Sequence, residues 1–430
     1  QPDSLRILHN PLTGWVLYAS MGVDAADFWA QYDHMYIPEL GHNVSVTDYA
    51  HTLYIRASWT DFNPQEDVYG WKIDSNLRAY IEGAYQRNMR LAFRVVVDSR
   101  DKRTEFTPQF VKDAGAKGFM NKGKWSPYSD DPVFQKYYTK FVKALAKDFN
   151  DPSKVEFIDG FGLGKWGEYH TMIYSTGDDT PKKAVFNWVT DIYSQAFDKV
   201  PVVINYHRWI GAGKDWVDDE HFAADSEEML EEAIKKGYSL RHDAFGMTTY
   251  YGSWERRFAK KYRNICPIIM EGGWIVKSHN YWQDPRGYRK DSHEDVRRGE
   301  FDDSKEAHVN MMDFRFGDTK SWFKDAFDLV RRFLREGGYR LYPSEISLPL
   351  EVSKKTTPTI KHCWNNLGWG YCPTNIPQWN QKYKVAFALL DSETNEVRYT
   401  FVDTDTDLSK WIKGSPAEYV FEPDMSKVET

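Results

Sequence analysis

FIDGFGL at 157–163 and PVVIN at 201–205 are short apolar runs, and residues 182–197 between them carry the spacing of an amphipathic helix. Short runs rich in β-branched and aromatic residues predict strands that are buried on both faces. Two such strands separated by a helix predict a βαβ unit, and therefore a parallel sheet.

The same alternation extends in both directions along the chain. The other predicted strands are GWVLY at 14–18, TLYIRAS at 52–58, LAFRVVV at 91–97, AFGMTT at 244–249, PIIM at 267–270 and HVNMMD at 308–313. Further helices are predicted near 77–85, 134–145, 226–236, 254–262 and 319–336. Eight such units favour an α/β fold of the (β/α)8 type, a TIM barrel, over an open doubly wound sheet. No Gly-x-Gly-x-x-Gly turn follows the first strand, which weakens the dinucleotide-binding alternative.

The pattern changes after Gly337 and Gly338. Short β-type runs at 340–350, 382–390 and 396–402 are separated by clusters of Pro, Asn, Asp and Thr. Such runs predict a small antiparallel β-sandwich. We therefore expect a (β/α)8 barrel over 1–337, followed by an all-β sandwich as an accessory domain over 338–430.

Charge and composition exclude some classes of function. The net charge is −7 over 430 residues without a basic block, so nucleic acid is a poor candidate partner. No run of eighteen apolar residues predicts a membrane span. Aromatic residues make up 16% of the chain, including 17 Trp, which fits either a large core or a ligand with flat apolar faces, such as a sugar. Composition leaves these two interpretations open.

The cysteines and the start of the chain give weaker indications. Cys363 and Cys372 lie in a predicted hairpin, HCWNNLGWGYC at 362–372, where a disulfide is an open alternative. Cys266 precedes an apolar strand and is predicted to be a buried thiol. The spacing fits no zinc motif, and no cofactor or metal is implied. The sequence opens at Gln1 rather than Met, which suggests a removed leader and a secreted, periplasmic or cell-surface protein.

Two glutamates stand where a barrel carries its chemistry, at the carboxyl ends of its strands. Glu168 lies in GKWGEYH at 164–170, after the fourth predicted strand, and Glu271 lies in MEGGW at 270–274, after the seventh. An ionised glutamate is costly to bury without a partner, so packing alone does not account for either. Two carboxylates at one barrel mouth are what glycosidic cleavage needs, one to protonate the departing oxygen and one to attack or to activate water.

These segments resemble the clan A glycoside hydrolases, which are retaining (β/α)8 glycosidases. RASWTDFNPQEDVYGW at 56–71 also resembles the second strand and following loop of β-galactosidase-like members. The resemblance implies that Glu168 is the acid/base, that Glu271 is the nucleophile, and that Arg56 orients the nucleophile. Many members have Asn directly before the fourth-strand glutamate, to contact the sugar 2-hydroxyl. Here that residue is Gly167, and Asn205 or His207 are candidates for the missing hydrogen bond.

Other polar and aromatic residues near predicted strand ends are candidates for sugar binding. They are Arg56, Trp59, Arg94, Asp98, Trp166, His170, Asn205, His207, Tyr250 and Trp274. For several the alternative is structural: the tryptophans as core residues, and Arg94 with Asp98 as an ion pair. His242 and Asp243 are predicted to precede the sixth strand, at the opposite end of the barrel. No Gly-x-Ser-x-Gly elbow occurs.

The sequence therefore predicts a glycoside hydrolase that cleaves O-glycosidic bonds of a poly- or oligosaccharide, by a retaining double displacement with two glutamates. Carbohydrate is the expected partner. One alternative is a non-catalytic carbohydrate-binding barrel, which the Gly167 departure favours. The other is a metal-dependent barrel hydrolase.

Overall fold

A closed barrel of eight parallel strands forms the first part of the protein. The computed structural model describes the chain except for residues 1–2, 4–5, 215–220, 248–249, 275–292 and 429–430. In chain order the barrel strands are β1 (Gly14–Tyr18), β4 (Ala50–Ser58), β5 (Arg90–Val96), β8 (Val155–Asp159), β9 (Val202–Asn205), β10 (Tyr238–Phe245), β11 (Ile268–Gly272) and β12 (Met311–Asp313). Pairing of Gly14 with Met311 closes the ring, which confirms the predicted TIM barrel.

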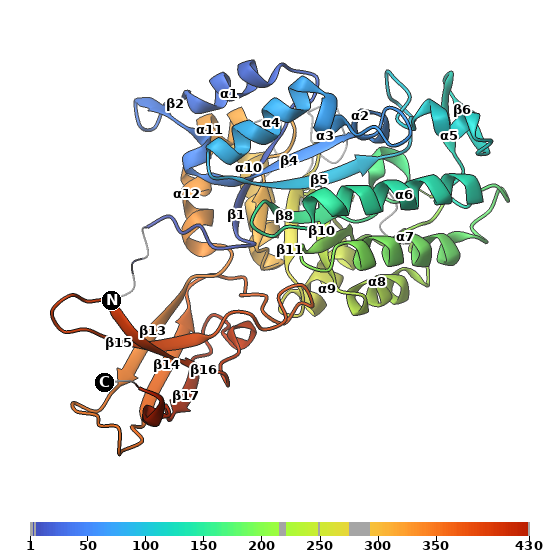
Figure 1. The fold of residues 1–430 in the computed structure, drawn as a ribbon. Coiled ribbons are helices and arrows are strands. Elements are labelled where there is room, and N and C mark those ends of the chain that lie inside the picture. The colour runs from blue at the N-terminus through green and yellow to red at the C-terminus, as the bar shows by residue number, and fades with distance from the viewer. Residues whose placement is uncertain (1–2, 4–5, 215–220, 248–249, 275–292, 429–430) are drawn as a thin grey trace.

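Helices surround the barrel (Figure 1). They are α1 (Ala25–Asp33), α2 (Trp59–Phe62), α3 (Gly70–Ile73), α4 (Ser75–Gln86), α5 (Gln109–Asp113), α6 (Pro132–Phe149), α7 (Lys182–Ala196), α8 (Ser226–Lys235), α9 (Ser253–Tyr262), α10 (His293–Glu306), α11 (Thr319–Asp325) and α12 (Phe327–Glu336). The hairpins β2 (Met35–Ile37) with β3 (His42–Val44), and β6 (Gly118–Asn121) with β7 (Lys124–Pro127), are insertions. Among the described helices, none combines the length and apolarity needed to cross a membrane.

Helix α6 illustrates how local sequence sets these elements. The Asp131 side chain caps its N-terminus by accepting from the Phe134 backbone N–H at 2.8 Å, and Pro132 occupies the first turn, where no N–H is needed. An apolar stripe that includes Phe141 and Leu145 is buried against the barrel.

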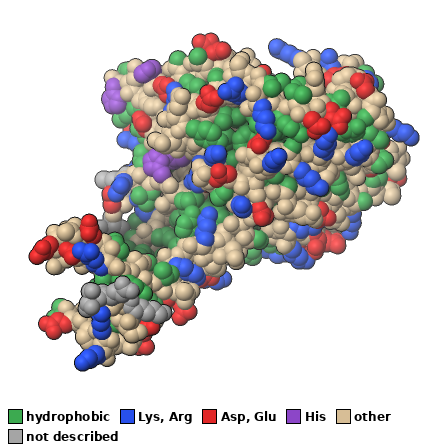
Figure 2. Space-filling model, in the orientation of Figure 1, with side chains coloured by type: hydrophobic (Ala, Val, Ile, Leu, Met, Phe, Trp, Pro, Cys, Tyr) green, Lys and Arg blue, Asp and Glu red, His purple; other side chains and the backbone are tan. Residues whose placement is uncertain are grey.

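The face shown in Figure 2 carries interspersed acidic and basic side chains over the barrel.

Two predicted strands are displaced, for the same reason. The sixth strand runs Tyr238–Phe245, not 244–249, whose last two residues lie outside the described part of the chain. The fourth runs Val155–Asp159, not 157–163. Both true strands contain charged residues that break an apolar run, and every residue of both is buried. Because charged residues also lie in the buried strands of this barrel, a prediction from apolar runs alone gives these two strands the wrong bounds.

The C-terminal part is all-β. One sheet has the order β13 (Leu341–Ser347), β14 (Ile360–Asn366) and β17 (Ala417–Phe421), and a second pairs β15 (Val385–Leu390) with β16 (Val397–Asp403). All pairings are antiparallel, and the sheets meet through Phe387, whose ring lies 5.1 Å from that of His362 and 5.8 Å from that of Phe421. These strands lie beside one end of the barrel (Figure 1). The boundary at 337/338 stays a prediction.

The segment between β14 and β15 closes the amino-terminal end of the barrel. The Trp369 indole N–H donates to the carbonyl of Val309 at 2.8 Å, and Asn310 donates to the carbonyl of Tyr371 at 2.8 Å. Trp379 is 3% exposed. It belongs to the same apolar cluster as the lumen residues of the strands, which are Val16, Tyr54, Ala92, Phe157, Val203, Ile269 and Met311. This segment is therefore part of the barrel core as well as of the C-terminal region.

The prediction of a hairpin at 362–372 is wrong. The first half of this segment belongs to β14, and the second half turns toward the amino-terminal end of the barrel. Cys266, Cys363 and Cys372 are all free thiols, so the open alternative of a disulfide is not realised. Cys266 is 2% exposed, as predicted, and burial raises the pKa of its thiol.

Replacement of Trp379 by alanine should destabilise the barrel strongly, because it removes a large side chain from the closed end of the lumen. We expect a loss of roughly 3–5 kcal/mol in the free energy of unfolding. Trp274→Ala is the matched control, since Trp274 is 57% exposed, and it should leave the melting temperature nearly unchanged. Equal melting temperatures for the two variants would contradict this account of the floor.

Candidate active site

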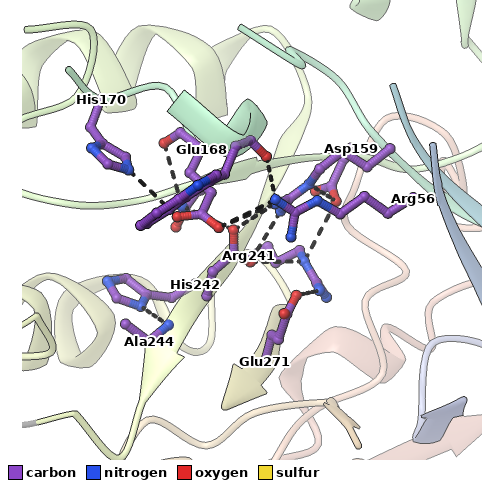
Figure 3. A network of polar contacts seen from close by, with 12 residues as sticks. Arg56, Asp159, Glu168, His170, Arg241, His242, Ala244 and Glu271 are labelled. Atoms are coloured by element: carbon purple, nitrogen blue, oxygen red, sulfur yellow. Dashed lines mark hydrogen bonds and ion pairs between the residues drawn. The ribbon is translucent and has the colours of Figure 1, made fainter. Parts of the chain in front are cut away.

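A cavity of about 330 Å³ opens at the carboxyl ends of the barrel strands. It is lined by Arg56, Trp166, Glu168, Asp243, Ala244, Met247, Tyr250, Glu271, Trp274 and Arg315. Both candidate glutamates belong to this lining, and Figure 3 shows them facing one group of arginine side chains. The barrel therefore brings together two carboxylates that lie far apart in the sequence.

Glu271 accepts a hydrogen bond from an arginine of the neighbouring strand, on the side that faces the barrel interior. It lies in β11, is 4% exposed, and accepts a hydrogen bond from Nη2 of Arg241 in β10. The same nitrogen lies 3.2 Å from Oδ2 of Asp313, which pairs with Glu271 across β11 and β12. Arg241 thus binds two carboxylates at once and fixes the orientation of Glu271.

Glu168 is placed by a strained turn rather than by the end of a strand. The 3-10 turn η2 (Lys165–Gly167) follows β8 after a loop, and Trp166 has φ 59°, which is unusual for a bulky residue. Glu168 is 7% exposed. Its Oε1 lies 3.8 Å from Nη2 of Arg56 and 4.0 Å from Nη1 of Arg94, and its Oε2 lies 3.5 Å from Nε2 of His170.

The turn gives a physical reason for Gly167. Its φ is +73°, in the left-handed region, and a Cβ there would lie 3.2 Å from Cγ2 of Val96. The amide of Asn205 lies nearby: Nδ2 is 3.4 Å from the carbonyl oxygen of Glu168 and 3.2 Å from Oδ2 of Asp243. An asparagine amide is therefore supplied beside Glu168 by β9 instead of by the residue before it.

A buried network of charges lies beneath the cavity. Arg94 donates to Asp159 at 2.9 Å and lies 2.7 Å from Asp243, and Nε of Arg241 lies 3.2 Å from Asp243. Asp159 also accepts a hydrogen bond from Tyr54, whose ring lies 4.4 Å below the Arg241 guanidinium. Both arginines are 0% exposed, so their charges depend on these carboxylates and on the aromatic ring for stabilisation.

The network has more acids than bases. Two arginines, Arg94 and Arg241, contact five carboxylates, those of Asp159, Glu168, Asp243, Glu271 and Asp313. Burial, together with the negative charge of Asp243, raises the pKa of Glu271 to about 8. Burial likewise raises the pKa of Asp313 to about 6. Burial would also raise the pKa of Asp243, but Arg94 and Arg241 outweigh it and hold that pKa below its ordinary value.

The histidines near Glu168 are buried and hold its backbone or its carboxylate. Nε2 of His207 lies 3.0 Å from the carbonyl oxygen of Glu168, while Nδ1 accepts from the Trp209 backbone N–H at 3.2 Å. His207 therefore carries its proton on Nε2, and burial lowers its pKa well below the ordinary value. His170 is 0% exposed and contacts Thr171 through Nδ1 at 2.7 Å.

Most of the residues predicted to bind sugar lie in or next to the cavity, and two do not. Arg56, Trp166, Tyr250 and Trp274 line it, whereas Arg94, His170, Asn205 and His207 lie behind its wall. The prediction for Trp59 is wrong, because Trp59 is 0% exposed and packs against Tyr138 and Phe134 of α6. Asp98 lies outside the lining and bonds to Arg100 at 2.5 Å, so the predicted Arg94–Asp98 ion pair is not formed.

Four charged residues of the site were not predicted as site residues from the sequence: Asp159, Arg241, Asp243 and Asp313. His242 and Asp243 lie within β10, and Asp243 reaches the cavity, so their predicted place before the sixth strand is wrong. Arg241, rather than Arg56, pairs with Glu271, while Arg56 donates to the Trp166 carbonyl and lies beside Glu168. The sequence does carry a signal for these residues. Charged residues at alternate positions of a strand, as at 241 and 243, point to the same face of the sheet.

The comparisons with known proteins give distant structural similarity. No family model and no curated protein matches the sequence. Endoglucanase Cel5A from Pseudomonas stutzeri is similar at 9% identity, with 75% of this chain and 94% of that chain covered and a TM-score of 0.43. Endo-glycoceramidase II from Rhodococcus sp., as a lactosyl-enzyme intermediate, has 12% identity, coverage of 96% and 97%, and a TM-score of 0.43. Exo-beta-1,4-mannosidase Op5Man5 from Opitutaceae bacterium strain TAV5 has 12% identity, coverage of 79% and 58%, and a TM-score of 0.41. At such similarity, the activity has to be inferred from the chain's own residues.

The raised pKa of Glu271 predicts a pH-dependent cost in stability. Its folded-state pKa of about 8 lies above the ordinary value of 4.5, so the folded state loses stability as pH rises from 4.5 through 8. Glu271→Gln removes this contribution. We expect the variant to melt above the wild type at pH 9 and to match it near pH 4.5, as measured by calorimetry across that range. A constant difference at all pH values would contradict the assigned pKa.

Proposed function

We propose that the protein is a glycoside hydrolase that cleaves O-glycosidic bonds of a poly- or oligosaccharide with retention of anomeric configuration. The observation that supports this most strongly is that Glu168, from the turn after β8, and Glu271, from β11, line one cavity at the barrel mouth. A pair of carboxyl groups flanking the scissile bond is the minimal equipment for this reaction. Trp166, Tyr250 and Trp274 supply aromatic faces in the same lining for stacking against sugar rings.

In the proposed mechanism Glu271 attacks the anomeric carbon while Glu168 donates its proton to the departing glycosidic oxygen. The C–O bond to the leaving group breaks and a glycosyl ester of Glu271 forms. Glu168, now ionised, removes a proton from water, and the resulting hydroxide oxygen displaces Glu271 from the anomeric carbon. Both glutamates are restored to their first protonation states.

The buried network supports these roles. The reactive form has the proton on Glu168 and the negative charge on Glu271. Arg241 stabilises that charge by its direct hydrogen bond, and Asp313 competes for the same nitrogen, so a proton on Asp313 leaves Arg241 more available to Glu271. Arg56 and Arg94 lie 3.8 Å and 4.0 Å from Glu168, where their positive charges face the carboxylate left after proton donation.

A non-catalytic carbohydrate-binding barrel is the main alternative, and binding of glycans without any product would support it. A metal-dependent hydrolase is a second alternative, and loss of activity in the presence of a chelator would support it. In the described part of the chain, no group of three or more His, Cys, Asp or Glu side chains is arranged as a metal site. Secretion, or a periplasmic or cell-surface location, also stays a proposal.

Substitution of either glutamate tests the function directly. Glu168→Gln and Glu271→Gln should each lower turnover by about 10²–10⁴-fold or more on a natural glycan. Glu156→Gln is the matched control, because Glu156 is also buried, at 4% exposure, but lies at the opposite end of the barrel, where it pairs with Arg90. Its turnover should be unchanged.

A substrate with a good leaving group distinguishes the acid/base role of Glu168 from the nucleophile role of Glu271. A dinitrophenyl glycoside needs little protonation, so Glu168→Gln should keep most of its kcat/KM on it, although kcat falls because the second step still needs Glu168 as base. Glu271→Gln should lose both kcat/KM and kcat. NMR of the first product should show the anomer of the substrate. Activity of Glu271→Gln at the wild-type rate would contradict its role, and an inverted product would contradict the retaining mechanism.

The pH dependence follows from the shared proton. The pair is active with one proton between them. Because the pKa of Glu271 is raised to about 8, the pair loses that last proton above this pH, and kcat/KM should fall there. Asp243→Asn removes a negative charge that raises the pKa of Glu271, and should move this alkaline limb to lower pH. Asp98→Asn, outside the cavity, should leave the limb in place. A limb unmoved by Asp243→Asn would contradict the coupling.

A further inference from the structure

A second and larger cavity, of about 750 Å³, adjoins the active-site cavity. The two share Trp274 and Arg315 in their linings. The rest of the second cavity comes mainly from the segment after β12, from α11, and from Arg297 of α10. A chain of sugar units that leaves the reaction centre past Trp274 therefore enters this second space.

Two exposed aromatic rings are available here to a sugar. Trp274 is 57% exposed and Phe316 is 54% exposed, and both line the second cavity. The Phe316 ring also contacts that of Tyr18, with 5.9 Å between the ring centroids. The exposed parts of both aromatic rings are flat and apolar, which suits them to the C–H faces of sugar rings. The rings indicate a binding surface rather than a gap between elements.

The charge of the second cavity differs from that of the first. Among the described residues that line it, the cations are Arg297, Arg315, Lys320 and Lys324, and the carboxylates are Asp318 and Asp325. Asp318 is engaged by Arg297 at 3.2 Å and by Arg315 at 3.3 Å. Within the described residues, neither Lys320 nor Lys324 has a carboxylate at ion-pair distance, and both are exposed on α11.

The first cavity has no such excess of cations. Among its described lining residues, Glu168, Asp243 and Glu271 stand against Arg56 and Arg315. A sugar unit that carries a negative group is therefore disfavoured beside the two glutamates and favoured one cavity away, near the lysines of α11. The difference in charge between the two cavities therefore determines which way round an acidic substrate binds along the cleft.

We propose that the second cavity is a subsite for an anionic sugar unit next to the cleaved bond, so that the substrate is an acidic oligo- or polysaccharide carrying carboxylate or sulfate groups. Trp274 and Phe316 would hold the ring, and Lys320 and Lys324 would bind the anionic oxygens. This inference rests on the proposed function of the first cavity.

Arg315 connects the subsite with the reaction centre. Its side chain lines both cavities, and its backbone N–H donates to Oδ1 of Asp313 at 2.7 Å. Asp313 in turn contacts Arg241, which binds Glu271. Two residues, Asp313 and Arg241, therefore connect the backbone of Arg315 with the proposed nucleophile.

The test uses calorimetric binding to full-length Glu271→Gln protein, so that no probe is consumed. The probes are tetragalacturonate for carboxylate, a sulfated carrageenan tetrasaccharide for sulfate, and cellotetraose and galactotetraose as neutral ligands. Lys320→Ala with Lys324→Ala should weaken binding of the preferred acidic probe by about 3–30-fold and reduce its salt dependence, leaving neutral probes unaffected. The carboxylate and sulfate arms identify which anionic group is recognised.

The matched control is Lys143→Ala with Lys147→Ala, which removes two exposed lysines at the same i, i+4 spacing from α6. It should leave binding of every probe unchanged. Phe316→Ala should weaken acidic probes without affecting their salt dependence. Neutral probes that bind as tightly as both acidic probes, or an equal loss in both double variants, would overturn the proposal.

Turnover by the wild-type protein on the same probes separates this inference from the proposed function. Cleavage confined to neutral probes would overturn the anionic subsite while leaving the glycosidase intact. Lysine-dependent binding of an acidic probe that is not cleaved, together with no cleavage of any probe, would overturn the glycosidase while the subsite stands. Cleavage of an acidic probe with a KM that rises in Lys320→Ala with Lys324→Ala supports both.

Discussion

The contact on which the site depends is the buried guanidinium of Arg241 between four acidic neighbours. It is 0% exposed and reaches Asp159, Asp243, Glu271 and Asp313 from one position in the lumen. Without the arginines, such a concentration of carboxylates could not remain ionised in a protein interior. Arg241 therefore fixes the place of Glu271 and also sets how many protons the cluster holds.

The barrel separates this charged layer from an apolar one. Tyr54 marks the border, because its hydroxyl donates to Asp159 while its ring supports the Arg241 guanidinium. Below it the lumen is filled by aliphatic and aromatic side chains and is closed by the segment around Trp379. This closed end keeps water from one side of the network, so the open mouth is the side from which a ligand reaches Glu168 and Glu271.

The two glutamates are held by different means. Glu271 is part of a strand whose register with β12 is fixed, with Met270 opposite Met312 and Glu271 opposite Asp313. Glu168 depends on a turn with left-handed residues at 166 and 167, and on His207 and Asn205 binding its backbone carbonyl. The strained turn is thus held by side chains of the next strand, which is how residues in uncommon backbone conformations persist. A substitution in β9 should therefore disturb Glu168 before it disturbs Glu271.

The sequence by itself determined the repeated strand–helix order, the barrel class and the all-β character of the C-terminal part, because these depend on local periodicity. It also pointed to Glu168 and Glu271, whose catalytic roles stay a proposal. It placed strands β8 and β10 wrongly, since Asp159, Arg241 and Asp243 interrupt the apolar runs. Only the tertiary structure decided that these charges neutralise one another inside the lumen, that Trp59 belongs to the core, and that residues near Trp379 close the barrel. Pairing between residues distant in the chain leaves no periodic trace in the sequence, because the burial of a charge is compensated by a partner on another strand and not by its own neighbours.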